Sequence, residues 1–341
     1  MADSCEYWPV GWNSWRLLEG AMGISGALPA DTSVLKGANI VEYLMAHGKQ
    51  MGFNTFRMFG FGDGAGCMLQ PSPGQYNEQA FAATDLVLAL AAQHGMKVIV
   101  AITDYWKITD GVQQYVNWCN GGNKDDFFTN EGCHQLYRSH TQAWIDKMAE
   151  FVKSVDPNHM VTIGEEGFFA AGDPHESRNP SGSGGWASST GQDFTGNHRS
   201  PHIDFCTCHI WPDNWKVGGV DFVTSWLDAH IAAAASLGKP LLVEEFGKVV
   251  TADTDACDSS ERSPYFEAVY GKVEASIRAG GAAKGAMFWE WTVKGAGETL
   301  DVSWPNGTHP MGVCIDSSTF RGPVKNFAAF VASHQTAQGR C

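Results

Sequence analysis

The fold is decided by the stretch Lys239-Pro-Leu-Leu-Val-Glu-Glu-Phe-Gly-Lys248. Its apolar run Leu241-Leu242-Val243 predicts a buried strand, because parallel strands covered on both faces are almost continuously apolar. The strand ends on two carboxylates, Glu244 and Glu245, and in barrel-type α/β enzymes the C-terminal strand ends carry the active site. Successive strand residues point to opposite faces, so we expect one acid to face the site and the other to pair with a cation or water. Two acids that merely cap a strand end are the alternative.

Similar apolar runs recur along the chain and alternate with helical patterns. The expected strands are residues 8–12, 53–58, 97–102, 160–163, 203–209, 241–243 and 286–289. The expected helices are residues 34–47, 78–93, 136–155, 222–236 and 265–278. This alternation predicts a parallel sheet with right-handed crossovers. We therefore expect one α/β domain over residues 1–341, a (β/α)8 TIM barrel in which seven strands are recognisable and the eighth is missing between residues 102 and 160.

Charge and composition limit the classes of partner. The chain has 23 Lys and Arg against 37 Asp and Glu, a net charge of −14, which disfavours nucleic acid and anionic membrane surfaces. No apolar run approaches the ~20 residues that a membrane span needs. The chain also carries 13 tryptophans and 19 phenylalanines. These rings either fill the core or stack on the apolar faces of sugars.

The cysteines bear on the cellular compartment. Nine cysteines are more than a cytosolic enzyme usually carries, so we expect disulfides, one cysteine left over, and an extracellular or secretory location. Asn306-Gly-Thr308 is a single glycosylation sequon. The start Met1-Ala-Asp-Ser-Cys-Glu6 has neither the basic region nor the apolar centre of a signal peptide.

Polar and aromatic side chains collect where the expected strands end. Carboxylates, a cation, an imidazole and aromatic platforms at one edge of a barrel are typical of a carbohydrate site. The candidates are Arg57, Trp106, Glu165, Glu166, His209, Trp211, Glu245 and Trp289.

Several of these candidates have a simpler explanation. Arg57 could only neutralise a buried acid, because buried charges need partners. Trp289 could belong to the core. Cys206-x-Cys208-His209 could be a zinc fragment, although zinc sites usually have wider spacing and a fourth ligand.

Longer motifs resemble a known family. Asn54-x-x-Arg57, His209-x-Trp211-Pro-Asp-x-Trp215, Glu245-Phe-Gly and Phe288-Trp289 resemble the family 5 glycoside hydrolases. Leu69-Gln-Pro-Ser-Pro-Gly-Gln-Tyr-Asn-Glu78, Asp125-Asp-Phe-Phe-Thr129 and Gly164-Glu-Glu-Gly-Phe168 resemble the endo-β-1,4-mannanases of plants and fungi. The likeness extends from about Gly11 to Ser333.

The resemblance implies a TIM barrel that hydrolyses the β-1,4-mannosidic bonds of mannan with retention. It implies that Glu245 is the nucleophile and that Arg57 and His209 orient the carboxylates. It also implies that Trp211 and Trp289 line the sugar subsites. We expect a polysaccharide substrate, no metal or organic cofactor, no nucleic-acid or membrane partner, and a monomer.

One motif of the family is absent. The resemblance places the general acid/base in an Asn-Glu-Pro motif after the fourth strand, and this chain contains no Asn-Glu-Pro. The motif would fall at Ser139-His140-Thr141, where the strand count is also one short. A retaining mechanism needs this acid, and Glu165 or Glu166 is the candidate substitute. A non-catalytic glycan-binding barrel and a β-glucanase of the same fold are the alternative functions.

Overall fold

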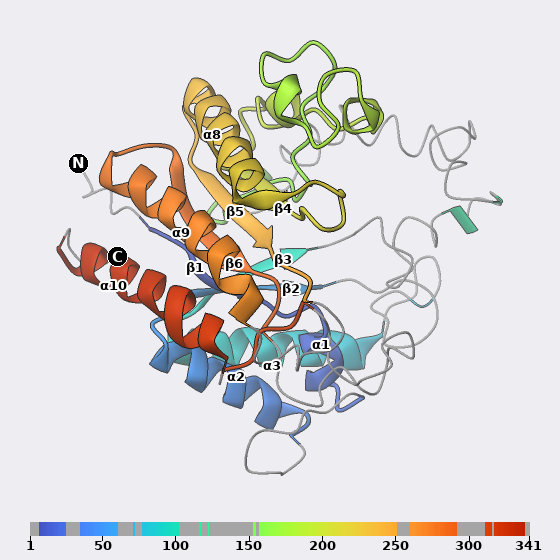
Figure 1. The fold of residues 1–341 in the computed structure, drawn as a ribbon. Coiled ribbons are helices and arrows are strands. Elements are labelled where there is room, and N and C mark those ends of the chain that lie inside the picture. Colours follow the sequence, from blue (N-terminus) through green and yellow to red (C-terminus); the bar gives the residue numbers. More distant parts are fainter. Residues whose placement is uncertain are drawn as a thin grey trace, which may run out of the picture.

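The structure, a computed structural model, describes residues 7–24, 35–60, 71, 77–101, 116–117, 122, 153–154, 157–250, 260–291, 311–315 and 317–337. These residues form an α/β architecture around one parallel sheet (Figure 1). Its strands are β1 (Val10–Asn13), β2 (Thr55–Phe59), β3 (Lys97–Ala101), β4 (Cys206–Ile210), β5 (Leu241–Phe246) and β6 (Ala283–Phe288).

The six described strands form a curled half-barrel in the order β3-β2-β1-β6-β5-β4. All of their pairings are parallel, and β1 joins the two halves through β2 and β6. This confirms the predicted α/β class and parallel sheet. The edges of the described sheet are β3, which directly precedes the gap seen in the sequence, and β4.

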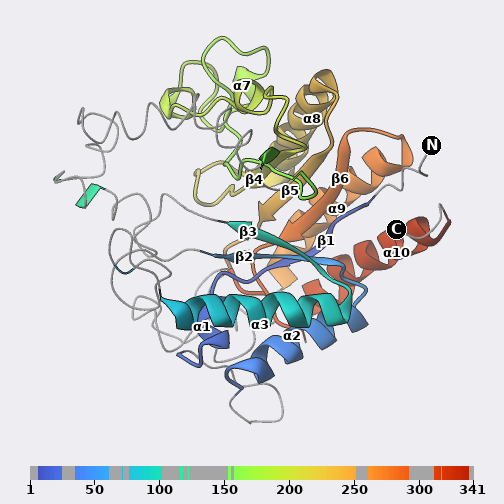
Figure 2. The ribbon, with the colours of Figure 1, turned by 180° about the vertical axis from the view of Figure 1, so that it is seen from behind.

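Helices cover the outer face of the sheet, as Figure 1 and the reverse view in Figure 2 show. They are α1 (Leu17–Ala21), α2 (Ala38–Gln50), α3 (Glu78–His94), α8 (Gly219–Leu237), α9 (Ser263–Arg278) and α10 (Lys325–Ala337). Shorter turns of helix are α7 (Phe194–Asn197), Glu176–Arg178, Trp186–Ser189, Ser260–Arg262 and Phe320–Val324.

The helix boundaries follow from capping residues. The Asn77 side chain accepts the Gln79 N–H at the start of α3, and Gly95 ends it at a left-handed φ of 67°. Gly238 ends α8 in the same conformation, at a φ of 69°. Four of the five predicted helices are found with small shifts at their ends. The fifth, at residues 136–155, lies almost entirely outside the described residues.

One predicted strand, residues 160–163, is wrong: this segment has no strand structure, although it runs alongside β4. The Asp204 N–H donates to the Val161 carbonyl at 2.8 Å. However, the Asp204 carboxylate accepts the Val161 N–H, and the Thr207 hydroxyl donates to the Ile163 carbonyl. Side chains thus occupy positions that a second strand's backbone would take in a ladder. Met160 is left 67 % exposed.

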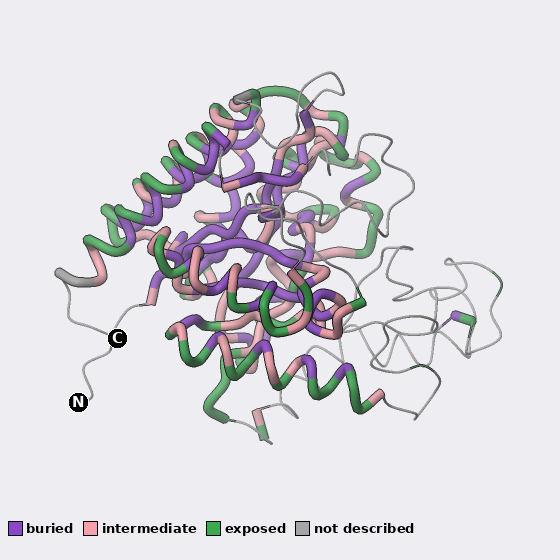
Figure 3. Tube along the Cα trace, turned by 90° about the horizontal axis from the view of Figure 1, so that it is seen from below, coloured by how far each residue is buried: buried purple, intermediate pink, exposed green. Residues whose placement is uncertain are grey.

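The core lies between the sheet and the helices, where Figure 3 shows buried strands inside a layer of helices with exposed outer faces. Trp12 of β1 is fully buried and packs against Phe56 at 5.3 Å and Trp291 at 4.9 Å between ring centroids. Tyr270 of α9 stacks on Phe327 of α10 at 4.5 Å. These aromatic pairs join neighbouring strands to each other and α9 to α10.

The cysteines differ from the prediction in one respect. Cys314 is disulfide-bonded. Cys206 and Cys208, however, are both free and buried in β4, so more than one cysteine is left over. Within the described ranges, no helix is both long enough and apolar enough to cross a membrane.

The close contact between β1 and β2 at Gly11 can be tested by substitution. A Cβ on Gly11 would lie 1.6 Å from the Thr55 carbonyl oxygen of the paired strand. We expect Gly11→Ala to lower the free energy of unfolding by about 3 kcal/mol, measured by urea unfolding. The matched control is Gly271→Ala in α9, where a Cβ meets open space. It should stabilise the helix by up to about 1 kcal/mol. Equal effects of the two substitutions would contradict this view of the β1–β2 contact.

Candidate active site

Glu244 and Glu245 lie on β5, and a β-bulge decides where they point. Cys208 pairs with Val243 but His209 pairs with Glu245, so Glu244 is an extra residue opposite β4. The bulge breaks the two-residue alternation of side chains. Glu244 pairs with the cations Arg57 and His209, as expected for one of the two acids, but the bulge places it beside the same cations as Glu245 and not on the opposite face of the sheet.

Arg57 on β2 is a buried cation between the two acids. Its Nη1 donates to Glu245 Oε2 at 2.8 Å, and its Nε lies 3.5 Å from Glu244 Oε1. Nη1 also lies 3.1 Å from Asn13 Oδ1, and the Asn13 amide donates to the carbonyls of Glu244 and Phe288. Asn13 therefore connects β1 to the acid-bearing strand and helps to orient the guanidinium.

His209 at the end of β4 is shared by three carboxylates. Its Nε2 lies 3.3 Å from Glu244, and its Nδ1 lies 3.6 Å from Glu166 and 3.9 Å from Glu245. Burial lowers the pKa of His209, but the charges of Glu245, Glu166 and Glu244 outweigh it and raise the pKa to about 10. His209 is therefore a cation at neutral pH. For Glu244, burial alone would raise the pKa of the carboxyl, but the charges of Arg57 and His209 outweigh burial and hold that pKa below its usual value.

Glu166 enters the site from the segment beside β4. Trp215 Nε1 donates to its Oε2 at 3.1 Å, and its own carbonyl accepts the His209 N–H at 3.2 Å. Gly167, which follows, has a φ of 94°, and a Cβ there would lie 2.9 Å from Cys208 Cβ. The next residue after Glu166 must therefore be glycine for the chain to turn against β4.

Glu165 is buried on the other side of this segment. Its Oε2 accepts from the Asn197 amide at 2.9 Å, and its Oε1 lies 3.4 Å from His198 Nδ1. That imidazole donates from Nδ1 to the Phe194 carbonyl and accepts the Thr207 N–H at Nε2, as a neutral ring does. Burial lowers the pKa of His198 to about 4, so it brings no positive charge. Burial then raises the pKa of Glu165 to about 8.

Two of the predicted sugar-binding tryptophans lie beside Glu245. Trp211 Nε1 donates to Glu245 Oε1 at 2.8 Å. Trp289 is half-buried at the end of β6, and its ring lies 6.4 Å from that of Trp211 at an angle of 79°. The two indoles thus stand perpendicular to each other next to the carboxylate. The third, Trp106, lies outside the described residues.

Sequence reasoning missed three contacts in this cluster. Asn13 directly follows the first predicted strand, so its place at a strand end was a usable signal. Trp215 belongs to the motif that contains His209, but its contact with Glu166 depends on a turn that no local pattern reveals. Glu244 was assigned to the opposite face because the bulge in β5 leaves no mark in the sequence.

The described residues offer no metal site: no group of three or more His, Cys, Asp or Glu among them could hold an ion. For the Cys206-x-Cys208-His209 alternative, burial raises the pKa of Cys206 to about 12. Structural zinc sites use four ligands, and no such set surrounds these two buried, free thiols among the described residues.

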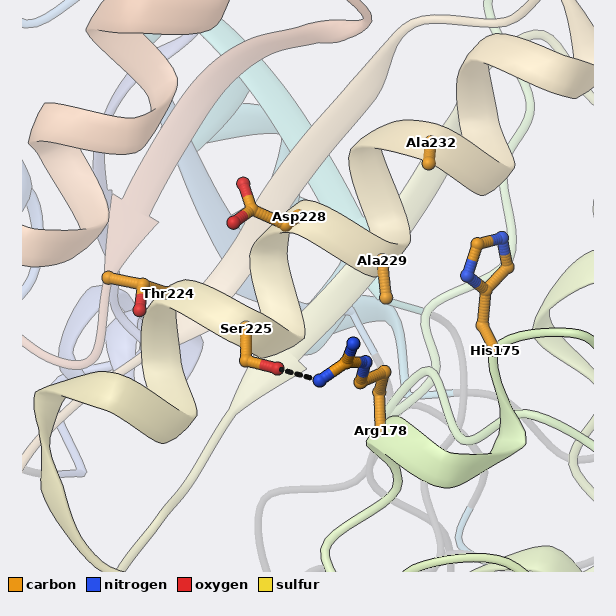
Figure 4. A pocket seen from close by; sticks show the side chains of 7 residues that line it. All are labelled: His175, Arg178, Thr224, Ser225, Asp228, Ala229 and Ala232. Atoms are coloured by element: carbon orange, nitrogen blue, oxygen red, sulfur yellow. Dashed lines mark hydrogen bonds between the residues drawn. The ribbon is translucent and has the colours of Figure 1, made fainter.

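A groove elsewhere contains none of the predicted site residues. It lies on the outer side of α8 between His175, Arg178, Ser225 and Asp228, as Figure 4 shows. Arg178 donates to the Ser225 hydroxyl at 3.1 Å, and Asp228 is paired with Lys272 at 2.7 Å. The charged groups of this groove are thus each paired, Arg178 within the groove and Asp228 with Lys272 outside it, and neither joins the carboxylates that converge at β5.

Comparison with known proteins identifies the family of the chain. The profile of the glycoside hydrolase family 5 β-mannosidase-like proteins matches residues 4–142 and 128–316. Mannan endo-1,4-beta-mannosidase 1 of Oryza sativa subsp. japonica is 36 % identical over an alignment of 348 positions, which covers 86 % of this chain and 76 % of that protein. Mannan endo-1,4-beta-mannosidase 7 of Arabidopsis thaliana is 33 % identical over an alignment of 297 positions, which covers 72 % of this chain and 67 % of that protein.

The fold has a solved counterpart. The X-ray structure of the endo-beta-1,4-mannanase from Thermotoga petrophila matches with a TM-score of 0.74 at 21 % identity. The match covers 98 % of this chain and 79 % of that chain, which supports the α/β, TIM-barrel-like fold class predicted from the sequence. With the profile match and the plant relatives, the conclusion is that the chain belongs to the β-mannosidase-like proteins of glycoside hydrolase family 5.

Proposed function

We propose that this protein binds β-1,4-mannan and hydrolyses its internal bonds by a retaining double displacement. One observation carries the proposal: the Glu245 carboxylate is held on both oxygens, by Arg57 at 2.8 Å and by the Trp211 indole at 2.8 Å, with His209 beside it. A nucleophile must be fixed against the sugar, and these contacts fix it. The plant relatives named mannan endo-1,4-beta-mannosidases support mannan as the substrate.

In this proposal Glu245 attacks the anomeric carbon and forms a covalent glycosyl-enzyme, which water then hydrolyses. Arg57 and His209 orient the carboxylate, and Glu244 neutralises part of their charge. The half-buried Trp289 offers the sugar an apolar face, while the buried Trp211 behind it holds the attacking carboxylate through its indole N–H. No step requires a metal or organic cofactor.

Glu166 is the better candidate for the acid/base. Its Oε1 and that of Glu245 both contact His209 Nδ1. The two oxygens therefore lie no farther apart than the sum of those distances, about 7.5 Å, a limit that includes the ~5–5.5 Å spacing of retaining enzymes. Its side chain is also 23 % exposed, so a substrate can reach it. Glu165 is more buried and its carboxyl is engaged by Asn197.

The family's own acid is still missing. The sequence contains no Asn-Glu-Pro. The family profile also matches in two stretches that overlap at residues 128–142, a range that includes Ser139-His140-Thr141. These residues lie outside the described ranges. In this proposal Glu166 acts from a position other than that of the motif. We therefore expect a turnover rate as much as ~10²–10⁴-fold lower than that of an enzyme with the motif, because this is the usual contribution of proton transfer.

The missing motif also favours a second candidate, a barrel that binds mannan without hydrolysing it. The nucleophile cluster and the tryptophans would then serve recognition alone. Incubation of the chain with mannan and with β-glucan, beside a binding assay with oligosaccharides of each, separates the candidates. Binding of mannan oligosaccharides without release of reducing ends selects the binding protein.

The first prediction concerns the nucleophile. Glu245→Gln keeps the shape of the side chain but removes the attacking carboxylate, so release of reducing ends from mannan should stop. Binding of mannohexaose, measured by calorimetry, should stay within about threefold, because the rest of the cleft is unchanged. Undiminished hydrolysis by Glu245→Gln would exclude this residue as the nucleophile.

A second prediction separates the two candidate acids, which are neighbours in the sequence. Glu166→Gln should reduce mannan hydrolysis by about 10²-fold or more, whereas the matched control Glu165→Gln should leave it within about threefold. Aryl mannosides with good leaving groups need no protonation, so Glu166→Gln should retain more activity on them. If Glu165→Gln is the damaging substitution, the assignment must be reversed.

A third prediction concerns pH. The pKa of Glu165 is raised to about 8 in the fold, so the folded chain holds a proton that the unfolded chain releases near its usual value of 4.5. This contribution to stability is complete below pH 4.5 and is lost as the pH rises to 8. Between those limits the wild type should lose about 4 kcal/mol more than Glu165→Gln in urea unfolding.

The remaining buried groups serve as an internal control for this experiment. His209, with its pKa raised to about 10, and Glu290, with its pKa raised by burial to about 8, are present in both proteins. The contributions of these groups to stability also fall as the pH rises, but by the same amount in the wild type and in Glu165→Gln. Parallel stability curves for the wild type and Glu165→Gln would contradict a neutral Glu165.

A further inference from the structure

Trp186 differs from the other tryptophans that the structure describes. Its side chain belongs to an exposed residue, with 48 % of its surface accessible, whereas the remaining described tryptophans are buried or half-buried. A large apolar ring in water is unfavourable, and one of this size next to a binding site often serves recognition. The turn Trp186–Ser189 belongs to the segment that also carries Glu166, and this segment lies on the β4 side of the sheet in Figures 1 and 2.

Hydrogen bonds fix the turn that carries this ring. The Ala187 N–H donates to Ser181 Oγ at 3.0 Å, and the Asn179 amide donates to Ser188 Oγ at 3.2 Å. Ala187 itself is fully buried. Glu176 accepts the N–H groups of Gly172 and Gly184, at 3.0 and 2.7 Å. The indole is therefore held in place before a ligand arrives, which lowers the entropic cost of binding.

A row of aromatic rings connects Trp186 with the site. Its ring packs edge-on against Phe168 at 5.2 Å and 85°, and Phe168 packs against Trp215 at 5.4 Å. Trp215 in turn donates to Glu166 at 3.1 Å. The Trp186 ring thus lies within a few sugar residues of Glu166. The perpendicular contact with Phe168 also fixes the plane of the indole.

The surroundings favour a neutral, hydroxyl-rich ligand. Ser189 and Thr190, which follow the ring, are exposed and can exchange hydrogen bonds with sugar hydroxyls. The chain carries a net charge of −14, which opposes anionic ligands. A single exposed ring is also too small an apolar area for a stable protein interface. A pyranose ring matches it, because one face of the sugar presents C–H groups to the indole.

We propose that Trp186 forms a distal stacking subsite for a β-mannan chain, on the Glu166 side of the cleft. This inference rests on the proposed function, since an enzyme or binding protein for internal bonds must accommodate sugar residues on both sides of its centre. The subsite extends recognition beyond Trp211 and Trp289. It should therefore matter for long chains and not for short ones.

The test compares ligands of two lengths in the full chain carrying Glu245→Gln, so that no hydrolysis occurs. Addition of Trp186→Ala should weaken mannohexaose binding about tenfold in calorimetry. Mannobiose binding should change less than about twofold. Trp186→Phe should restore most of the loss, because it keeps an aromatic face. The control is Phe81→Ala, which removes a 42 % exposed ring from α3 at the opposite side of the sheet.

The outcomes distinguish a failure of the Trp186 subsite from a failure of the proposed function. If the parent binds mannohexaose and Trp186→Ala binds it equally well, the subsite is excluded while the proposed function stands. Equal weakening of both ligands, or a fall in melting temperature absent from Phe81→Ala, would make Trp186 a structural residue. If the parent binds neither mannooligosaccharide, the proposed function fails and the subsite with it.

Discussion

The buried charge of Arg57 is the constraint on which the site depends. A guanidinium 7 % exposed is tolerated only with carboxylates beside it, and both of its acid partners come from β5 on the far side of β1 and β6. The pairing therefore fixes the curvature of the sheet as well as the site. His209 extends the same network to β4, so three strands contribute to one cluster of charges.

The bulge in β5 gives the two acids of this cluster different environments. Glu244 is 2 % exposed and touches both cations, which suits a permanent counter-ion. Glu245 keeps more exposure and points between Arg57 and Trp211, where a sugar could approach. A regular strand would have sent one acid to the helix layer. One extra residue opposite β4 thus supplies a partner for the cations without occupying the reactive position.

The sequence predicted the class of fold, most element positions and the convergence of Arg57, His209 and Glu245, because strand ends in a parallel sheet share one edge. It could not predict features set by tertiary contacts. The run at residues 160–163 reads as a strand, but Asp204 and Thr207 use their side chains to bind its backbone. Likewise Glu165 and Glu166 look equivalent in sequence, and only Asn197 and Trp215 distinguish them. The catalytic roles themselves stay predictions.

The segment alongside β4 has a consequence for how the protein responds to heat. It carries Glu166 but follows β4 through a few hydrogen bonds, several of them from side chains, whereas Glu245 lies in a strand paired on both sides. Regions with fewer backbone bonds open at lower free energy than the strands of a core. Local unfolding would then release Glu166 from His209 before the sheet melts. The two proposed catalytic acids thus belong to units of different stability, and warming should separate them reversibly while the rest of the fold persists.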